Sequence, residues 1–253
     1  MDGDRFEIWV ASGFLLGLRV MPVFVFAPPF SLLRVPRPFL VIMSLGFAAV
    51  LISAMPEADR LPHVDAAVLM LGGLREFFVG LVPVVVLQLM FGSLYIVGRT
   101  IDVQAGFGLA LLIDPMTRGQ MPLAGTIFAY ALAATFFAMG GQFDLLRFFA
   151  ASLKAVPLGG AIEISGVAAL ATYATTVSLV ALGVGGAAIA TLLMCDLVIA
   201  MLSRTVPQMN ALLLGIQVKV AVMLVVVPLV LGVSGALFVR LVAVALEAMP
   251  RFV

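Results

Sequence analysis

The sequence predicts an all-α integral membrane protein, because the composition is strongly apolar and the apolar residues gather in long uncharged segments. Hydrophobic residues make up 64% and charged residues 11% of the 253-residue chain, and the mean hydropathy is +1.25. Soluble domains average roughly 45–50% apolar and about 25% charged residues. A soluble fold of this length could not cover so much apolar surface, so a bundle of membrane helices is expected.

Five segments contain no Asp, Glu, Lys or Arg and reach the roughly 18 residues that a membrane-spanning helix requires. They are residues 38–56, 77–98, 119–143, 164–195 and 220–239. A sixth segment, residues 8–26, is interrupted by Arg19. Proline and glycine between the segments indicate turns, so no linker to a separate soluble domain is expected.

Charge and cysteine content exclude several classes of function. The formal net charge is +1, and Lys and Arg are scattered singly, which is not the basic patch of a nucleic-acid-binding protein. Cys195 is the single cysteine, so neither an internal disulfide nor a cysteine-based metal site is expected. The N-terminus lacks a positively charged region and a small-residue cleavage site, so we expect no removable signal peptide.

A short amphipathic helix is predicted over residues 144–154. Asp144 and Arg147 stand three residues apart, while the positions between and after them are largely Leu and Phe. This pattern is typical of a helix that lies on or beside a membrane.

Several charged residues lie inside or beside apolar segments. Exposure of such a charge to hydrocarbon costs about 2.5–3.5 kcal/mol on insertion scales, so each side chain is expected to face protein, water or another charge. Arg99 and Asp102 are three residues apart on one helical face and are expected to pair; a polar pathway through the membrane is the alternative. The residues concerned are Arg19, Arg75, Glu76, Arg99, Asp102, Asp196, Arg204 and Lys219.

Residues 106–122 are predicted to be substantially non-helical. Glycines at 106 and 108 begin the stretch, and Pro115 restricts Asp114 to extended conformations. Irregular backbone at membrane depth is tolerated only when it is buried in protein or lines a water-filled cavity. We therefore expect this apolar loop to lie across an internal passage, with a simple connecting loop as the alternative.

These segments, taken together, carry a resemblance to a known family. The chain resembles the flagellar biosynthetic FliR family and its virulence-type secretion relatives over nearly its whole length. Gln142 and Gln217 depart from residues that the family often has at these positions, which affects local turns only. The matching positions are Pro28 to Ser31 with Pro36, residues 101–106, Asp114-Pro115, Met121-Pro122, and residues 204–210 with Gly215 and Lys219.

The resemblance implies a subunit of a type III protein export gate in the bacterial inner membrane, at the flagellar basal body. It implies a FliP-like part (residues 1–160) followed by a FliQ-like helical hairpin (residues 161–253), present in one copy beside FliP-type and FliQ-type subunits. The export components FlhB and FlhA and unfolded exported proteins are the other implied partners, besides the lipid bilayer.

The resemblance also assigns roles to individual residues. A plug that closes the central pore is expected at Gly106, Phe107, Gly108, Leu109, Leu111, Leu112, Ile113, Asp114, Pro115 and Met116. The polar turn between the two apolar arms of the hairpin predicts that Arg204, Pro207, Gln208, Asn210 and Lys219 serve assembly. Arg99, Asp102 and Gln104 are expected to serve assembly as well.

Three alternative functions remain. The first is the equivalent subunit of a virulence-type injectisome, although Gly215 favours the flagellar form. A small-solute transporter would show two similar halves with broken helices at matching places, and no such repeat is visible. An enzyme would need a nucleophile with its base or a metal site, but the single histidine, His63, lies in a polar loop. We therefore expect no catalytic, cofactor-binding or metal-binding residues.

Overall fold

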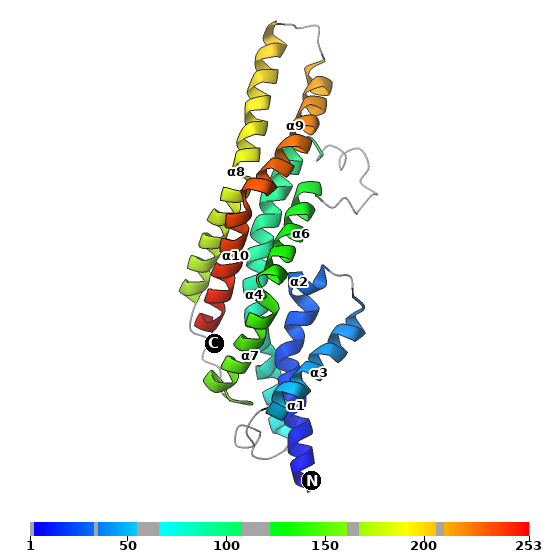
Figure 1. Ribbon diagram of the computed structural model, residues 1–253, viewed down its shortest axis with the longest axis vertical. Helices are drawn as coiled ribbons and strands as arrows, with labels where there is room; N and C mark the ends of the chain where they lie inside the picture. Colours follow the sequence, from blue (N-terminus) through cyan, green and yellow to red (C-terminus); the bar gives the residue numbers. More distant parts are fainter. Residues whose placement is uncertain are drawn as a thin grey trace. The chain divides into compact units, whose positions relative to one another are not determined.

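The computed structural model describes residues 3–32, 35–54, 66–107, 122–160, 167–205 and 210–252, and these residues form helices and short connections without strands (Figure 1). The predicted all-α fold class is confirmed. The helices are α1 (Gly3–Phe26), α2 (Pro28–Ser31), α3 (Arg37–Ala54), α4 (Ala66–Gln104), α6 (Leu123–Ala138), α7 (Gly141–Ala155), α8 (Val167–Thr205), α9 (Ala211–Val233), α10 (Gly235–Ala248) and the 3-10 helix η2 (Met249–Phe252).

Five helices of the described residues are long and apolar enough to cross a membrane, which confirms a multi-pass membrane protein. They are Phe6–Phe26, Arg37–Ala54, Leu69–Gln104, Ala168–Thr205 and Leu213–Val233. A sixth crossing exists only if α6 and α7, which meet at an angle of 66°, count as one bent span.

Two of the predicted segments are broken where the sequence suggested one helix. Residues 119–143 bend at Gly140, whose φ of +78° lies in the left-handed region that favours glycine. Residues 220–239 are divided at Ser234, where α9 ends and α10 begins. Uninterrupted apolar sequence predicted the membrane environment in both places, but it carried no information about the bend.

Helices α4 and α8 are longer than a bilayer requires. Each has 39 residues, which corresponds to about 58 Å at about 1.5 Å per residue. The hydrocarbon core is about 30 Å thick, and even a tilt of about 40° would not fit such a helix within it. Parts of both helices therefore lie outside the hydrocarbon core.

The chain divides into two compact units. The first comprises Met1–Leu89, Phe136–Tyr173 and Val244–Val253, and the second comprises Met90–Thr135 and Ala174–Ala243. Each unit takes residues from both sides of position 160, so the units do not test the division into residues 1–160 and 161–253, which stays a prediction.

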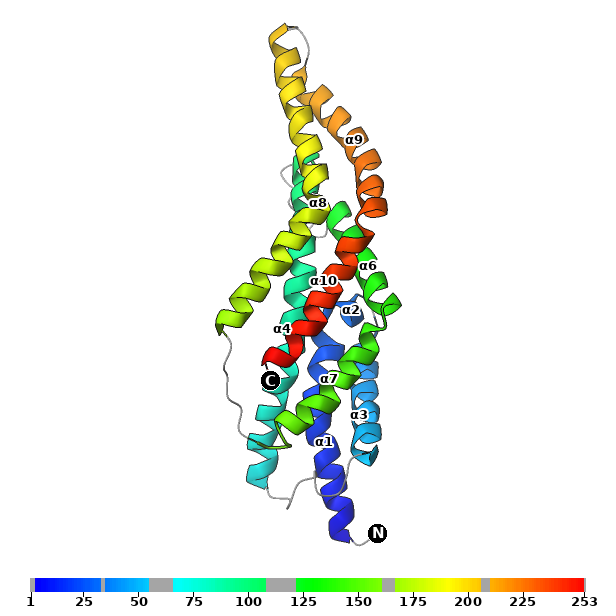
Figure 2. The same cartoon turned by 60° about the vertical axis from the view of Figure 1, so that its left-hand side comes forward.

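In the first unit, α1 lies between α3 and the first part of α4 (Figure 2). Glycine permits the close approach of α4, because a Cβ at Gly80 would overlap the backbone carbonyl of Arg19. Likewise a Cβ at Gly17 would lie 2.7 Å from a methyl group of Leu45 in α3. The core here includes Leu15, Leu16 and Val20 of α1, which are fully buried.

In the second unit, α4 and α6 touch through backbone. A Cβ at Gly98 would overlap the backbone of Gly125, so the beginning of α6 lies directly on α4. Helix α8 packs on the same part of α4, since a Cβ at Gly185 would overlap Val97. These crossings follow the small-residue rule for membrane helices.

Helix α7 is amphipathic, as predicted. Arg147 donates a hydrogen bond of 2.9 Å to Asp144. Its apolar face, with Leu145, Phe148 and Phe149, is buried by the chain itself. The protein itself therefore covers the apolar face that was expected to lie against a membrane, and the position of α7 beside a bilayer stays a prediction.

Candidate functional site

The residues predicted to matter divide into those that the structure describes and those that it does not. Gly106 and Phe107 of the predicted plug follow the end of α4, and six of the predicted assembly residues lie in described helices or at their ends. Outside the described residues are Gly108, Leu109, Leu111, Leu112, Ile113, Asp114, Pro115, Met116, Pro207 and Gln208.

Asp102 is a buried carboxylate that caps helix α6. Its side chain is in the interior, with 4% of the residue exposed. The two carboxylate oxygens accept hydrogen bonds from the backbone N–H of Ala124 at 3.0 and 3.1 Å, and one accepts from Gly125 at 3.4 Å. The first N–H groups of a helix have no partner within it, and a negative charge is favoured at this end. Asp102 supplies both needs.

The expected ion pair between Arg99 and Asp102 is not formed. Arg99 is exposed, whereas the Asp102 carboxylate points to the beginning of α6. The reason is tertiary: the contact between Gly98 and Gly125 brings unpaired N–H groups to the buried side chain. Leaving those groups unpaired in the interior would cost more than a pair with an exposed arginine contributes.

Helix α4 ends in a glycine turn at the base of the predicted plug. Gly106 has φ +99°, a conformation that side chains disfavour, and the N–H of Phe107 donates to the carbonyl of Asp102 at 3.1 Å. This is the usual left-handed helix end, and it confirms that Gly106 needs a glycine-specific backbone. Asp102, in the last turn of α4, therefore accepts hydrogen bonds on both sides of the predicted plug: its carbonyl accepts from Phe107, and its side chain accepts from the beginning of α6.

Lys219 joins three helices of the second unit. Its ammonium forms an ion pair of 2.5 Å with Asp196 of α8 and donates at 3.1 Å to the carbonyl of Gln104 at the end of α4. A cation is favoured at this C-terminal end. The charged partner of Lys219 is thus Asp196 of the same chain. Beside it, the Oε1 of Gln104 is buried without a hydrogen-bond partner.

Asn210 begins helix α9. Its side-chain oxygen accepts a hydrogen bond of 3.2 Å from the N–H of Leu213, which is the ordinary N-cap interaction. Arg204 is exposed in the last turn of α8, where its charge complements the helix dipole. The predicted roles of both residues in assembly stay predictions.

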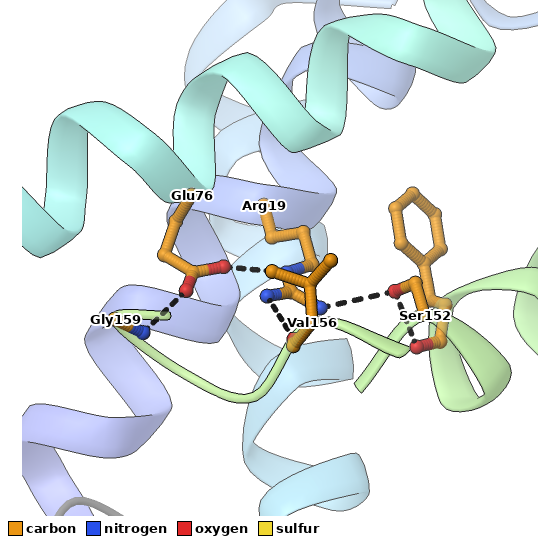
Figure 3. A network of polar contacts seen from close by, with 6 residues as sticks. Arg19, Glu76, Ser152, Val156 and Gly159 are labelled. Carbon is orange, nitrogen blue, oxygen red and sulfur yellow. Dashed lines mark hydrogen bonds and ion pairs between the residues drawn. The ribbon is translucent and has the colours of Figure 1, made fainter. Parts of the chain in front are cut away.

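The first unit contains a second buried polar centre, shown in Figure 3. Arg19 of α1 is fully buried and forms an ion pair, through its Nε, with Glu76 of α4, which is 1% exposed. The expectation that these charges face protein or each other is confirmed. Sequence analysis did not pair them, because 57 residues separate the two positions and no spacing rule connects them.

The arginine also binds the end of helix α7. Its Nη1 donates to Ser152 at 3.1 Å and its Nη2 donates to the carbonyl of Val156 at 2.9 Å. The remaining oxygen of Glu76 accepts from the N–H of Gly159 at 2.9 Å. The network is thus satisfied on both charged groups, as a buried pair requires.

No group of three or more His, Cys, Asp and Glu side chains that could hold a metal ion occurs within the described ranges. The arrangement of polar groups at Asp102, Lys219 and Arg19 is that of helix caps and interhelical pairs. These contacts pair opposite charges and give backbone groups their hydrogen-bond partners in apolar surroundings.

We expect Asp102→Ala to destabilise the purified protein, because the buried N–H groups of Ala124 and Gly125 would lose their acceptor. Such unpaired groups cost about 1–3 kcal/mol, so thermal unfolding in detergent should begin several degrees lower than in the wild type. Asp102→Asn retains an acceptor and should lose less. Asp144→Ala, which removes a half-buried carboxylate paired with the exposed Arg147, is the control, and equal melting temperatures for Asp102→Ala and Asp144→Ala would contradict the capping role.

Comparison with known proteins places this architecture in a family. The family model described as bacterial export proteins, family 1, matches residues 10–244. The chain is 27% identical over 242 residues to the flagellar biosynthetic protein FliR of Bacillus subtilis, covering 93% of this chain and 92% of that protein. It is 24% identical over 247 residues to FliR of Escherichia coli, covering 94% and 92%.

A virulence-type relative is also similar over a shorter stretch. The surface presentation of antigens protein SpaR of Shigella flexneri is 28% identical over 145 residues, covering 57% of this chain and 56% of that protein. The family match extends over nearly the whole described architecture and includes both buried polar centres. The chain therefore belongs to the bacterial export proteins of family 1.

Proposed function

We propose that the chain is a subunit of the flagellar type III protein export gate in the bacterial inner membrane, without catalytic activity. Together with FliP-type and FliQ-type subunits it forms a closed pore through which unfolded flagellar proteins pass, and it acts with the export components FlhB and FlhA. The observation that carries the proposal is the family match over residues 10–244. The apolar helices and the plug sequence agree with it.

Exposed apolar surface supports an assembly with other subunits. Large exposed apolar side chains occur along α4 from Met70 to Val103. These positions are 33 residues apart, about 50 Å along a helix, whereas a bilayer core is about 30 Å thick. Lipid tails cannot cover the whole stretch, so protein partners are needed for the rest.

Helix α9 supports the same conclusion from its burial. Within its membrane-span window only 17% of the residues are buried by the chain itself. Leu224, Val225 and Leu229 are more than half exposed. We propose that FliQ-type subunits pack on this surface, in keeping with a FliQ-like hairpin over residues 161–253.

The proposed seal of the pore is the stretch from Gly106 to Met116. Its apolar residues would pack together and exclude water, so that ions are blocked by dewetting while a passing chain can part the seal. The described part of this stretch is its beginning, where Gly106 turns the chain out of α4. Asp102 supports the proposal, because it is bonded to the helix ends on both sides of the stretch.

Deletion of residues 108–113 tests the seal. We expect the shortened subunit to remain in its complex and the membrane to become permeable to small ions, because the apolar constriction is removed. Conductance or ion leakage is measured in cells with the deletion, in wild-type cells and in cells that lack the subunit. An assembled deletion variant that is as tight as wild type would mean that this stretch is not the seal.

A second test concerns Lys219 as an assembly residue. Because Lys219 binds α8 through Asp196 and α4 through Gln104, we propose that it serves assembly by holding the α8–α9 hairpin in shape. Lys219→Ala should reduce the FliP-type and FliQ-type subunits that co-purify, and Asp196→Asn should do so in the same direction. Lys154→Ala, an exposed lysine on α7, is the control. Full assembly of Lys219→Ala combined with loss of export would assign the residue another role.

The equivalent subunit of a virulence-type injectisome is the second candidate. The similarity to SpaR over 57% of the chain favours it, but the FliR proteins match over 93% and 94%. Deletion of the gene distinguishes the two candidates, since loss of motility identifies the flagellar machine.

A further inference from the structure

The network in Figure 3 holds the connection after α7, here residues 156–160, by its backbone. At Gly159 both polar backbone groups are bound by neighbouring residues of α4. Its N–H donates to Glu76 at 2.9 Å, and its carbonyl accepts from the guanidinium of Arg75 at 3.1 Å. Gly159 has φ +74°, and a Cβ at Gly72 would lie 3.8 Å from its Cα. The connection therefore lies directly on α4.

Arg19 holds the other end of the same connection. Val156 follows the last residue of α7, and its carbonyl accepts from Arg19 at 2.9 Å. Ser152 accepts from Arg19 while its hydroxyl donates to the carbonyl of Phe149 at 2.8 Å. The cation thus lies at the C-terminal end of α7, where a helix favours positive charge.

The chemistry of the pair indicates what it is for. A fully buried ion pair is weak evidence for stability, because apolar residues of similar volume often support a fold as well or better. Apolar side chains, however, cannot bind the carbonyl of Val156 or the N–H of Gly159. Only the charged side chains can therefore bind the backbone groups of the connection after α7.

We infer that Arg19 and Glu76 are positioning residues, which fix the course of the chain where it leaves α7 toward α8. In the proposed division, residues 156–160 are the last of the FliP-like part, so the pair positions the residues directly before the FliQ-like hairpin. The inference rests on the proposed function for its consequence in assembly. The fixed connection itself is a property of the isolated chain.

The test replaces both charges by apolar side chains of similar length. Arg19→Met with Glu76→Met leaves no unpaired buried charge, so the protein should accumulate in the membrane as the wild type does. The release of the connection is measured with Val156→Cys in a Cys195→Ala background. The side chain at 156 is buried, with 9% exposed, and the replacement leaves its carbonyl in place for Arg19.

We expect a maleimide to label the cysteine at least about tenfold faster in the double methionine variant. This is the change expected when the net contribution of a hydrogen bond that keeps the cysteine buried is lost. Fewer FliP-type and FliQ-type subunits should co-purify with this variant at equal subunit abundance. The matched control is Asp144→Asn with Arg147→Gln, which neutralises an exposed pair in the same unit and should change neither quantity.

Unchanged labelling of the double methionine variant would overturn the inference, because apolar packing alone would then hold the connection. If that variant does not accumulate, Arg19→Leu with Glu76→Leu replaces it, since it also removes both charges and both side-chain contacts to the connection, and wild-type labelling would equally overturn the inference. Faster labelling with full assembly would refute the consequence for the hairpin. Failure of the proposed function is separate, since the wild-type subunit itself would then capture no FliP-type partner.

Discussion

Arg19 and Glu76 lie in apolar stretches of α1 and α4, and both side chains are buried. Each charge alone would be costly in such surroundings, so α1 and α4 are compelled to meet at this place. The small residue Gly80 makes the meeting possible, because α4 can approach the backbone of Arg19. The pair then binds the connection after α7, so three segments of the first unit share one polar centre.

The same constraint governs the second unit with different chemistry. Asp102 accepts hydrogen bonds from the first N–H groups of α6, and Lys219 donates one to the last carbonyl of α4. Both groups act on helix ends, where backbone N–H and carbonyl groups have no partner in the helix itself. Glycines at 98 and 125 again allow the helices to approach. The buried charges therefore bind helix ends and connect pairs of helices. The described residues present no cluster that could hold a metal ion.

The sequence predicted most of what depends on composition or on single residues. Apolar content predicted the membrane helices, and the glycine at 106 predicted the turn after α4. The pairing of charges was not predictable in the same way. Local spacing favoured Arg99 as the partner of Asp102, but the folded chain brings backbone groups of α6 to the carboxylate. Arg19 and Glu76 were recognised as charges in need of partners, yet their contact depends on how distant helices cross. The bend at Gly140 and the helix break at Ser234 lie within apolar sequence that gives no sign of either.

Assembly with FliP-type and FliQ-type subunits is the central proposal, since the chain itself leaves much of the apolar surface of α4 and α9 exposed. Native mass measurement of the tagged subunit, extracted in a mild detergent from cells that express the export genes, tests it directly. We expect a complex in which this 26.6 kDa chain is bound to several FliP-type and FliQ-type subunits. Recovery of a monodisperse, lone chain under conditions that keep the membrane proteins folded would contradict it.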